Sequence, residues 1–152
     1  RGQRELLRCS TQLENREDTM VSREDLESFL IRMDLEYEEV DDGMFLTRGR
    51  ESGTPVVVHH AEDLLLIRMK VMDMPDEGPG SAALYRTLLE LNATDVVHGA
   101  YGIEDGDLIL SDTLELETLD FLELQASMES IELAAATQIE KIRELAGFGS
   151  EG

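Results

Sequence analysis

The sequence is poor in the residues that make covalent cross-links or basic surfaces. It has one cysteine, three prolines and no tryptophan among 152 residues, and 13 lysines and arginines against 34 aspartates and glutamates, for a formal net charge of −21. A single cysteine, Cys9, excludes an intrachain disulfide, so a cytoplasmic location is expected. The shortage of basic residues argues against binding nucleic acid or an anionic membrane surface, because both require a basic patch.

Long apolar runs and enzyme motifs are missing as well. No run approaches the ~18 apolar residues of a membrane span, and the first twenty residues contain no signal-peptide core. The sequence has no G-x-S-x-G, no P-loop and no G-x-G-x-x-G. Carboxylates are so frequent that no pair stands out as general acid and base. We therefore expect no catalytic residue, no cofactor and no insertion into a membrane.

Histidine is the only residue type that suggests a metal, and it occurs three times. His59 and His60 are adjacent, and neighbouring residues on a strand point to opposite faces, so the pair cannot chelate one ion together. A site would need His98 or carboxylates folded beside one of them. We expect no metal, and an enzyme or metal protein with a site near these histidines is kept as an alternative.

The stretch HGAYGIEDGDLILSDTLEL, residues 98–116, predicts a β-hairpin. Gly106 can take the positive φ of a tight turn. An EF-hand loop that began at Asp105 would need a glycine where Leu110 stands, so the pattern favours a turn over a calcium site. The residues that alternate after the turn, with Asp112 as the exception, are Leu108, Leu110, Leu114 and Leu116.

The region before this hairpin predicts one helix and then strands. Ser22 and Asp25 have the spacing of a capping box. Leu26, Phe29, Leu30 and Met33 follow at the spacing of one buried helix face. The strand-forming segments are LEYEEV, MFLTR, PVVVHH and LLLIRMKVMDM, the last of which we interpret as a central strand.

A second helix is expected at Ser81–Asn92, with Asn92 as its C-cap. Its buried face is Leu84, Leu88 and Leu91, and Tyr85 and Leu89 lie beside that face. We predict a homodimer that uses Tyr85 and Leu89. Alternatively, the proline-bearing loop before the helix covers them.

The last helix is expected at Leu119–Ala146 and carries two apolar stripes. The core stripe is Phe121, Leu124, Met128, Ile131, Ala135, Ile139, Ile142 and Ala146. The second stripe is Leu119, Leu122, Ala126 and Leu133. Glu129, Glu132 and Glu140 rim the second stripe, which therefore suits a partner helix or strand with a basic flank. Alternatively, the first helix covers it through Phe29 or Met33.

Two stretches carry a family resemblance: PVVVHHAEDLLLIRMKV and ALYRTLLELNATDVVHGAYGIEDGDLILSDTLELETLDFLELQASMESI. Over roughly Met20 to Leu145 the chain resembles the YbjN-type domain and the class I type III secretion chaperones of the CesT type. YjfI-type proteins, which are associated with PspA-like membrane-stress proteins, are a weaker neighbour. The resemblance implies a small acidic dimer that binds other proteins and has no catalytic residues. The long last helix and the N-terminal segment depart from the secretion chaperones.

These patterns predict an α+β fold with an antiparallel twisted sheet flanked by helices. The expected order is helix, three strands, helix, hairpin, long helix. Residues 20–147 form one domain, 1–19 are an N-terminal extension or a cloning remnant, and 148–152 are a flexible tail. We predict a non-catalytic protein-binding chaperone or adaptor. An envelope-stress regulator acting on a PspA-like partner is the alternative.

Overall fold

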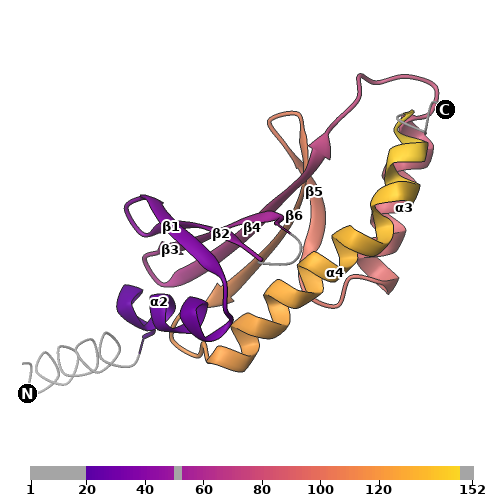
Figure 1. Ribbon diagram of the computed structural model, residues 1–152. Coiled ribbons are helices and arrows are strands. Elements are labelled where there is room, and N and C mark those ends of the chain that lie inside the picture. The colour runs from indigo at the N-terminus through magenta and orange to yellow at the C-terminus, as the bar shows by residue number, and fades with distance from the viewer. Residues whose placement is uncertain (1–19, 50–52, 148–152) are drawn as a thin grey trace, which may run out of the picture.

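The computed structural model of the chain describes residues 20–49 and 53–147 (Figure 1). The expected extension at 1–19 and the expected tail at 148–152 lie outside the described residues. The elements, in chain order, are α2 (Arg23–Arg32), β1 (Glu36–Asp41), β2 (Met44–Arg48), β3 (Pro55–Ala61), β4 (Leu64–Asp73), α3 (Ser81–Thr94), β5 (Ala100–Glu104), β6 (Asp107–Glu115) and α4 (Phe121–Leu145).

The six strands form one sheet in the order β1-β2-β3-β4-β6-β5, and every neighbouring pair is antiparallel. The predicted α+β class with an antiparallel sheet is confirmed. The region between α2 and α3 holds four strands, one more than the expected order counts. The reason is the turn at Asp41–Gly43, which joins two separate strands and pairs Glu38 of β1 with Leu46 of β2.

The three helices of the described residues, α2, α3 and α4, pack on the same face of the sheet. Phe45, Val58 and Ile67 are cross-strand neighbours on this face and are fully buried. The helix α4 crosses the sheet diagonally, and its second half lies beside α3 past the edge of the sheet (Figure 1). The core therefore lies between this face and the helices, and the other face has no helix of the described chain over it.

The start of α2 is fixed by the predicted capping box. The Asp25 amide donates to the Ser22 hydroxyl at 3.1 Å, and the Ser22 amide donates to the Asp25 carboxylate at 3.0 Å. At the other end of the helix, the ring of Phe29 meets the ring of Phe121 at 5.9 Å, edge to face. The guanidinium of Arg32 lies 3.8 Å from the centre of the Phe121 ring. The first helix is thus packed against the beginning of α4.

The predicted hairpin is present as β5 and β6. Asp105 and Gly106 have φ values of 50° and 81°, the two positive angles of a type I′ turn. The strand begins at Ala100, later than the alternation suggested, because Gly99 has a φ of 86° and turns the chain. The four leucines of the alternation are buried: Leu108, Leu110, Leu114 and Leu116.

Asp112, which breaks that alternation, links the hairpin to α4. Its carboxylate accepts a hydrogen bond of 2.6 Å from the hydroxyl of Ser127, which is itself buried. A polar residue on the core side of a strand costs stability unless it finds a partner. The break in the leucine pattern is therefore a contact between the sheet and the last helix.

Asn92 is not the C-cap of α3, which continues to Thr94 and is capped by Asp95. The Asn92 side chain instead bridges to the edge strand β5: it accepts from the Tyr101 amide at 2.7 Å and donates to the Tyr101 carbonyl at 3.2 Å. The Tyr101 hydroxyl donates to Gln138 of α4 at 2.6 Å. Burial raises the pKa of Tyr101 to about 12. These bonds lock α3, β5 and α4 together.

Candidate protein-binding surfaces

The sheet face that points away from the helices has an apolar centre. One cross-strand row runs Met44–His59–Leu66–Thr113, and the next runs Leu46–Val57–Arg68–Ser111. An antiparallel sheet face that only meets solvent is normally polar. The apolar side chains here, all half-buried, are Met44, Leu46, Val57, Leu66 and Ile109, and we call them the open-face cluster.

The open-face cluster was missed in the sequence, although a signal for it exists. VVV in β3 and LLLI in β4 are continuous apolar runs and do not alternate with polar residues. Such runs are typical of strands that are buried on both faces. In this fold the described helices cover only one face, so the second set of apolar side chains has no described helix over it.

Two basic side chains on this face, Arg68 and Lys70, pair with acidic neighbours. The Arg68 guanidinium lies 2.7 Å from the Glu104 carboxylate. The Lys70 ammonium lies 2.7 Å from Asp73 and 3.1 Å from Asp107. The hydrogen bonds that Lys70 donates to these two aspartates raise the pKa of Lys70, and the bond from Lys70 lowers the pKa of Asp73. Neither cation is left to attract an acidic ligand.

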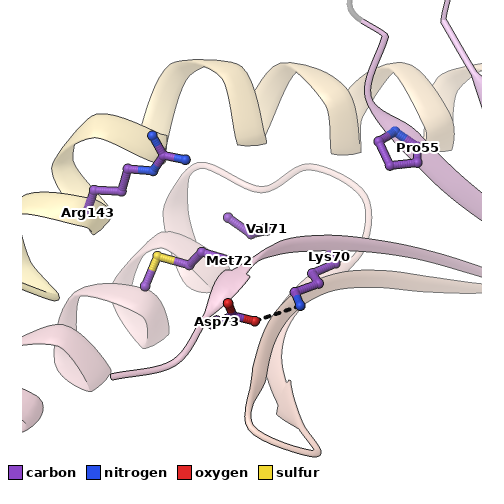
Figure 2. A pocket seen from close by; sticks show the side chains of 6 residues that line it. All are labelled: Pro55, Lys70, Val71, Met72, Asp73 and Arg143. Atoms are coloured by element: carbon purple, nitrogen blue, oxygen red, sulfur yellow. Dashed lines mark ion pairs between the residues drawn. The ribbon is translucent and has the colours of Figure 1, made fainter. Parts of the chain in front are cut away.

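A recess of about 490 Å³ lies where β4 leaves the sheet (Figure 2). The register of β4 and β6 shifts between Lys70 and Met72, and this bulge turns Val71 and Met72 towards the recess. Arg143 reaches over it from α4. With Lys70 held by Asp73, the recess offers mainly apolar surface and has room for a side chain of a bound protein.

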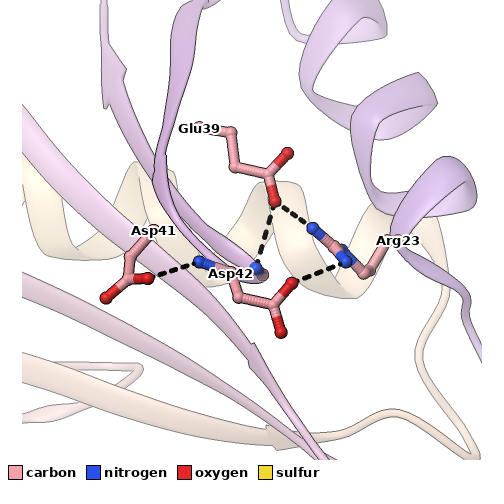
Figure 3. A network of polar contacts seen from close by, with 5 residues as sticks. Arg23, Glu39, Asp41 and Asp42 are labelled. Atoms are coloured by element: carbon pink, nitrogen blue, oxygen red, sulfur yellow. Dashed lines mark hydrogen bonds and ion pairs between the residues drawn. The ribbon is translucent and has the colours of Figure 1, made fainter.

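Acidic residues at the β1–β2 turn form a structural network (Figure 3). The Arg23 guanidinium of α2 pairs with Glu39 and, at 2.9 Å, with Asp42. The Gly43 amide also donates to Glu39, at 3.1 Å. These carboxylates hold α2 against the turn, so their clustering has a structural explanation.

The second stripe predicted on the last helix is exposed except at its first residue. Leu122 and Leu133 are 70% and 65% exposed, and Ala126 is exposed as well. Leu119 is buried, because it precedes α4 and packs into the core, so its assignment to an exposed stripe was wrong. Phe29 contacts Phe121, and the stripe from Leu122 onward is not covered by the first helix.

Carboxylates border this stripe. Glu129 and Glu140 are exposed, and Glu132 is half-buried. Burial raises the pKa of the Glu132 carboxyl, and the negative charge of Glu129 raises it further. The stripe therefore combines apolar side chains with negative charge that a cation would stabilise.

A second group of exposed apolar residues lies around α3 and the edge strand β5. Leu89 is 69% exposed and is not covered by the preceding loop, whereas Tyr85 is half-buried. Val97, in the turn after α3, is 81% exposed, and Ile103 of β5 is 53% exposed. The sequence pattern identified Leu89 as a surface residue and did not identify Val97 or Ile103 as one.

The three histidines lie at different places in the fold. His59 is on the open face, whereas the His60 ring is on the helix side, with its Nε2 2.8 Å from the carbonyl of Val21. His98 is half-buried in the turn before β5, and its amide donates to the Ser130 hydroxyl at 3.1 Å. Within residues 20–49 and 53–147, no three His, Cys, Asp or Glu side chains are grouped as metal ligands.

In the described part of the chain, no helix combines the length and the hydrophobicity of a membrane-spanning segment.

The chain is similar to solved structures of secretion chaperones. A chain of the ExoU–SpcU complex from the type III secretion system of Pseudomonas aeruginosa matches with a TM-score of 0.60 at 16% identity, over 74% of this chain and 93% of that chain. The Yersinia pestis type III secretion chaperone SycH, in complex with a fragment of YscM2, matches with a TM-score of 0.54 at 20% identity, over 74% and 94%. At these identities the likeness shows the fold.

YbjN from E. coli also matches, with a TM-score of 0.56 at 16% identity, over 77% of this chain and 93% of that chain. Curated protein sequences give no match. One family model, CesT_Tir_1, matches residues 4–147, which is nearly the whole sequence. This match and the structural neighbours favour the predicted chaperone function over the alternative of an envelope-stress regulator. The chain therefore belongs to the CesT_Tir_1 family of type III chaperones.

Proposed function

We propose that this protein is a non-catalytic chaperone or adaptor that holds an apolar, extended segment of a partner protein on the open-face cluster. The observation that carries the proposal is the apolar centre of a sheet face that none of the described helices covers. Family membership supports it, as do the neighbours solved as complexes, ExoU–SpcU, HopA1–SchA and SycH with YscM2.

An extended segment fits this face better than a helix does. Its side chains alternate with a period of two residues, so every second one can reach the cluster while the others face solvent. Glu36 and Glu38 on β1 border the cluster, so basic residues beside the apolar ones would improve the match.

The test compares lysine substitutions on and off the face. We expect Leu46→Lys and Leu66→Lys each to reduce co-purification of the partner from the native host by at least about tenfold. Lysine keeps its charged end in solvent, so the fold should persist, as a melting curve would check. Ile31→Lys makes the same charge change on α2, which packs on the other side of the sheet, and should leave binding intact. Unchanged binding by both leucine variants would contradict the proposal.

We also propose that the chain forms a homodimer through α3 and the free edge of β5. Leu89, Val97 and Ile103 expose apolar surface there, and β5 has a strand on only one side. Light scattering at tens of micromolar should give twice the 17.0 kDa mass of the chain, and Leu89→Lys should give the monomer. A wild-type monomer at that concentration would disprove the dimer.

A further inference from the structure

Six exposed residues on the outer side of α4 follow the spacing of a coiled-coil seam. Their numbers rise in steps of four, three, four, three and four, which is a heptad repeat of a and d positions. They lie on the opposite side of the helix from the buried Leu124, Ile131 and Gln138. We call them the α4 strip: Leu122, Ala126, Glu129, Leu133, Ala136 and Glu140.

The geometry of the strip suits a helix. It runs for about 27 Å along the axis, and its two leucines are about 16 Å apart, or three turns. Ala126 and Ala136 stand between and beyond the leucines and are small enough for another backbone to approach closely. An extended segment would have no matching period along this surface, because its side chains repeat every two residues.

The negative charge of the strip favours a partner helix that carries basic residues. Glu129 and Glu140 lie in the strip itself, Glu132 lies beside Glu129, and none of the six residues is basic. Glu132 already carries an unfavourable charge because it is partly buried near Glu129. Lysine or arginine placed alongside these carboxylates would relieve that repulsion.

A second copy of this chain is a poorer occupant. If Leu122 of one copy packed on Leu133 of the other, the symmetry of the antiparallel pair would bring Glu129 of both copies to the central layers. Like charges that lose solvent there oppose association. An anionic lipid surface is disfavoured by the same carboxylates.

We propose that the α4 strip binds an amphipathic helix of a partner protein, with apolar residues at heptad spacing and lysine or arginine on their flanks. This site goes beyond the proposed function, since the open-face cluster lies on the other side of the sheet and takes an extended segment. One partner can supply both elements, or two partners can bind at once.

The probe is a synthetic peptide of about three heptads with leucine at a and d and lysine at e and g, labelled for fluorescence anisotropy. We expect it to bind the full chain at 0.15 M salt, roughly physiological ionic strength. Leu122→Asp and Leu133→Asp should each weaken binding by at least about tenfold. Both changes add a negative charge, which attracts the lysines, so a loss of affinity reports the apolar contact.

Two further comparisons isolate charge and position. A peptide with glutamate in place of lysine should bind at least about tenfold more weakly, and Glu129→Gln should reduce the salt dependence of binding. Val40→Asp, which places the same charge on β1, should bind like the wild type. The variant carrying Leu46→Lys and Leu66→Lys should also bind the peptide, which separates this site from the open-face cluster.

Three results would overturn the proposal. The first is unchanged peptide affinity in both leucine variants. The second is equal affinity for the lysine and glutamate peptides. The third is a fall in the mass of the wild-type assembly on Leu122→Asp or Leu133→Asp, because a second copy would then occupy the strip. Melting curves that match the wild type confirm that the variants are folded.

Discussion

Replacing Gly99 with alanine should lower the free energy of unfolding by about 3 kcal/mol, a large effect for a single methyl group. Gly99 has a φ of 86°, a conformation that side chains with a Cβ rarely adopt. A Cβ at this position would lie 2.6 Å from the carbonyl oxygen of Ser111 and 3.2 Å from its carbonyl carbon. Because the obstacle is the backbone of β6, β5 would have to move away from its neighbour in the described sheet.

Gly106→Ala is the matched control for this substitution. Gly106 has a φ of 81°, but a Cβ there would meet no atom within 4 Å. Only the conformational cost should remain, about 1 kcal/mol. Urea denaturation of both variants gives the two values, and their difference measures the close approach of Gly99 to β6. Equal destabilisation would show that this approach carries no energetic weight.

Ile131→Ala should cost about 3 kcal/mol, whereas Leu133→Ala, two residues further along the same helix, should cost less than about 0.5 kcal/mol. Ile131 is fully buried between α4 and the sheet, and truncating it leaves a cavity. Leu133 is mostly exposed on the α4 strip, so its loss changes little in the isolated chain. Both substitutions remove helix-compatible apolar side chains, so helix propensity does not explain the contrast.

Thermal melts followed by circular dichroism measure this contrast. For a domain of this size, about 3 kcal/mol corresponds to a melting temperature lower by roughly 10 °C. The Leu133→Ala variant should melt with the wild type. If it melted as early as Ile131→Ala, the strip would be part of the core, and the proposed helix-binding site would be lost with it.

Local patterns predicted most of the fold because local chemistry determines those parts. The capping box of Ser22 and Asp25 and the positive φ angles at Asp105–Gly106 depend on neighbours in sequence. The segment LEYEEV was identified as strand-forming, although in the strand EYEEVD only Tyr37 is even half-buried. An edge strand that contributes so little to the core has a weak apolar pattern.

Contacts between distant segments were beyond the sequence patterns. Asn92 was interpreted as a helix cap, the common local role of asparagine, but its amide is satisfied by Tyr101 on β5. The buried bonds of Asp112 with Ser127 and of Tyr101 with Gln138 likewise require knowledge of which elements meet. The pattern of apolar residues does not predict which polar side chains of distant elements will form hydrogen bonds.

The candidate surfaces were predicted in part for the same reason. Helical period identified Leu122, Ala126 and Leu133 as lying away from the core, and they do. It misplaced Leu119, which comes before the helix and does not follow its period. The open-face cluster could not be assigned from sequence, because a continuous apolar strand does not show which of its faces the helices will cover.

The position of α4 after the strands in the chain order has a consequence for synthesis. All six strands are complete at Glu115, but Ile131, Met128 and Leu124, which close the core, come later. A ribosome that has just released the hairpin has therefore produced the described strands with α2 and α3, but the part of the core face that α4 covers is still bare. Until α4 emerges, this growing chain is itself a molecule in need of protection from aggregation.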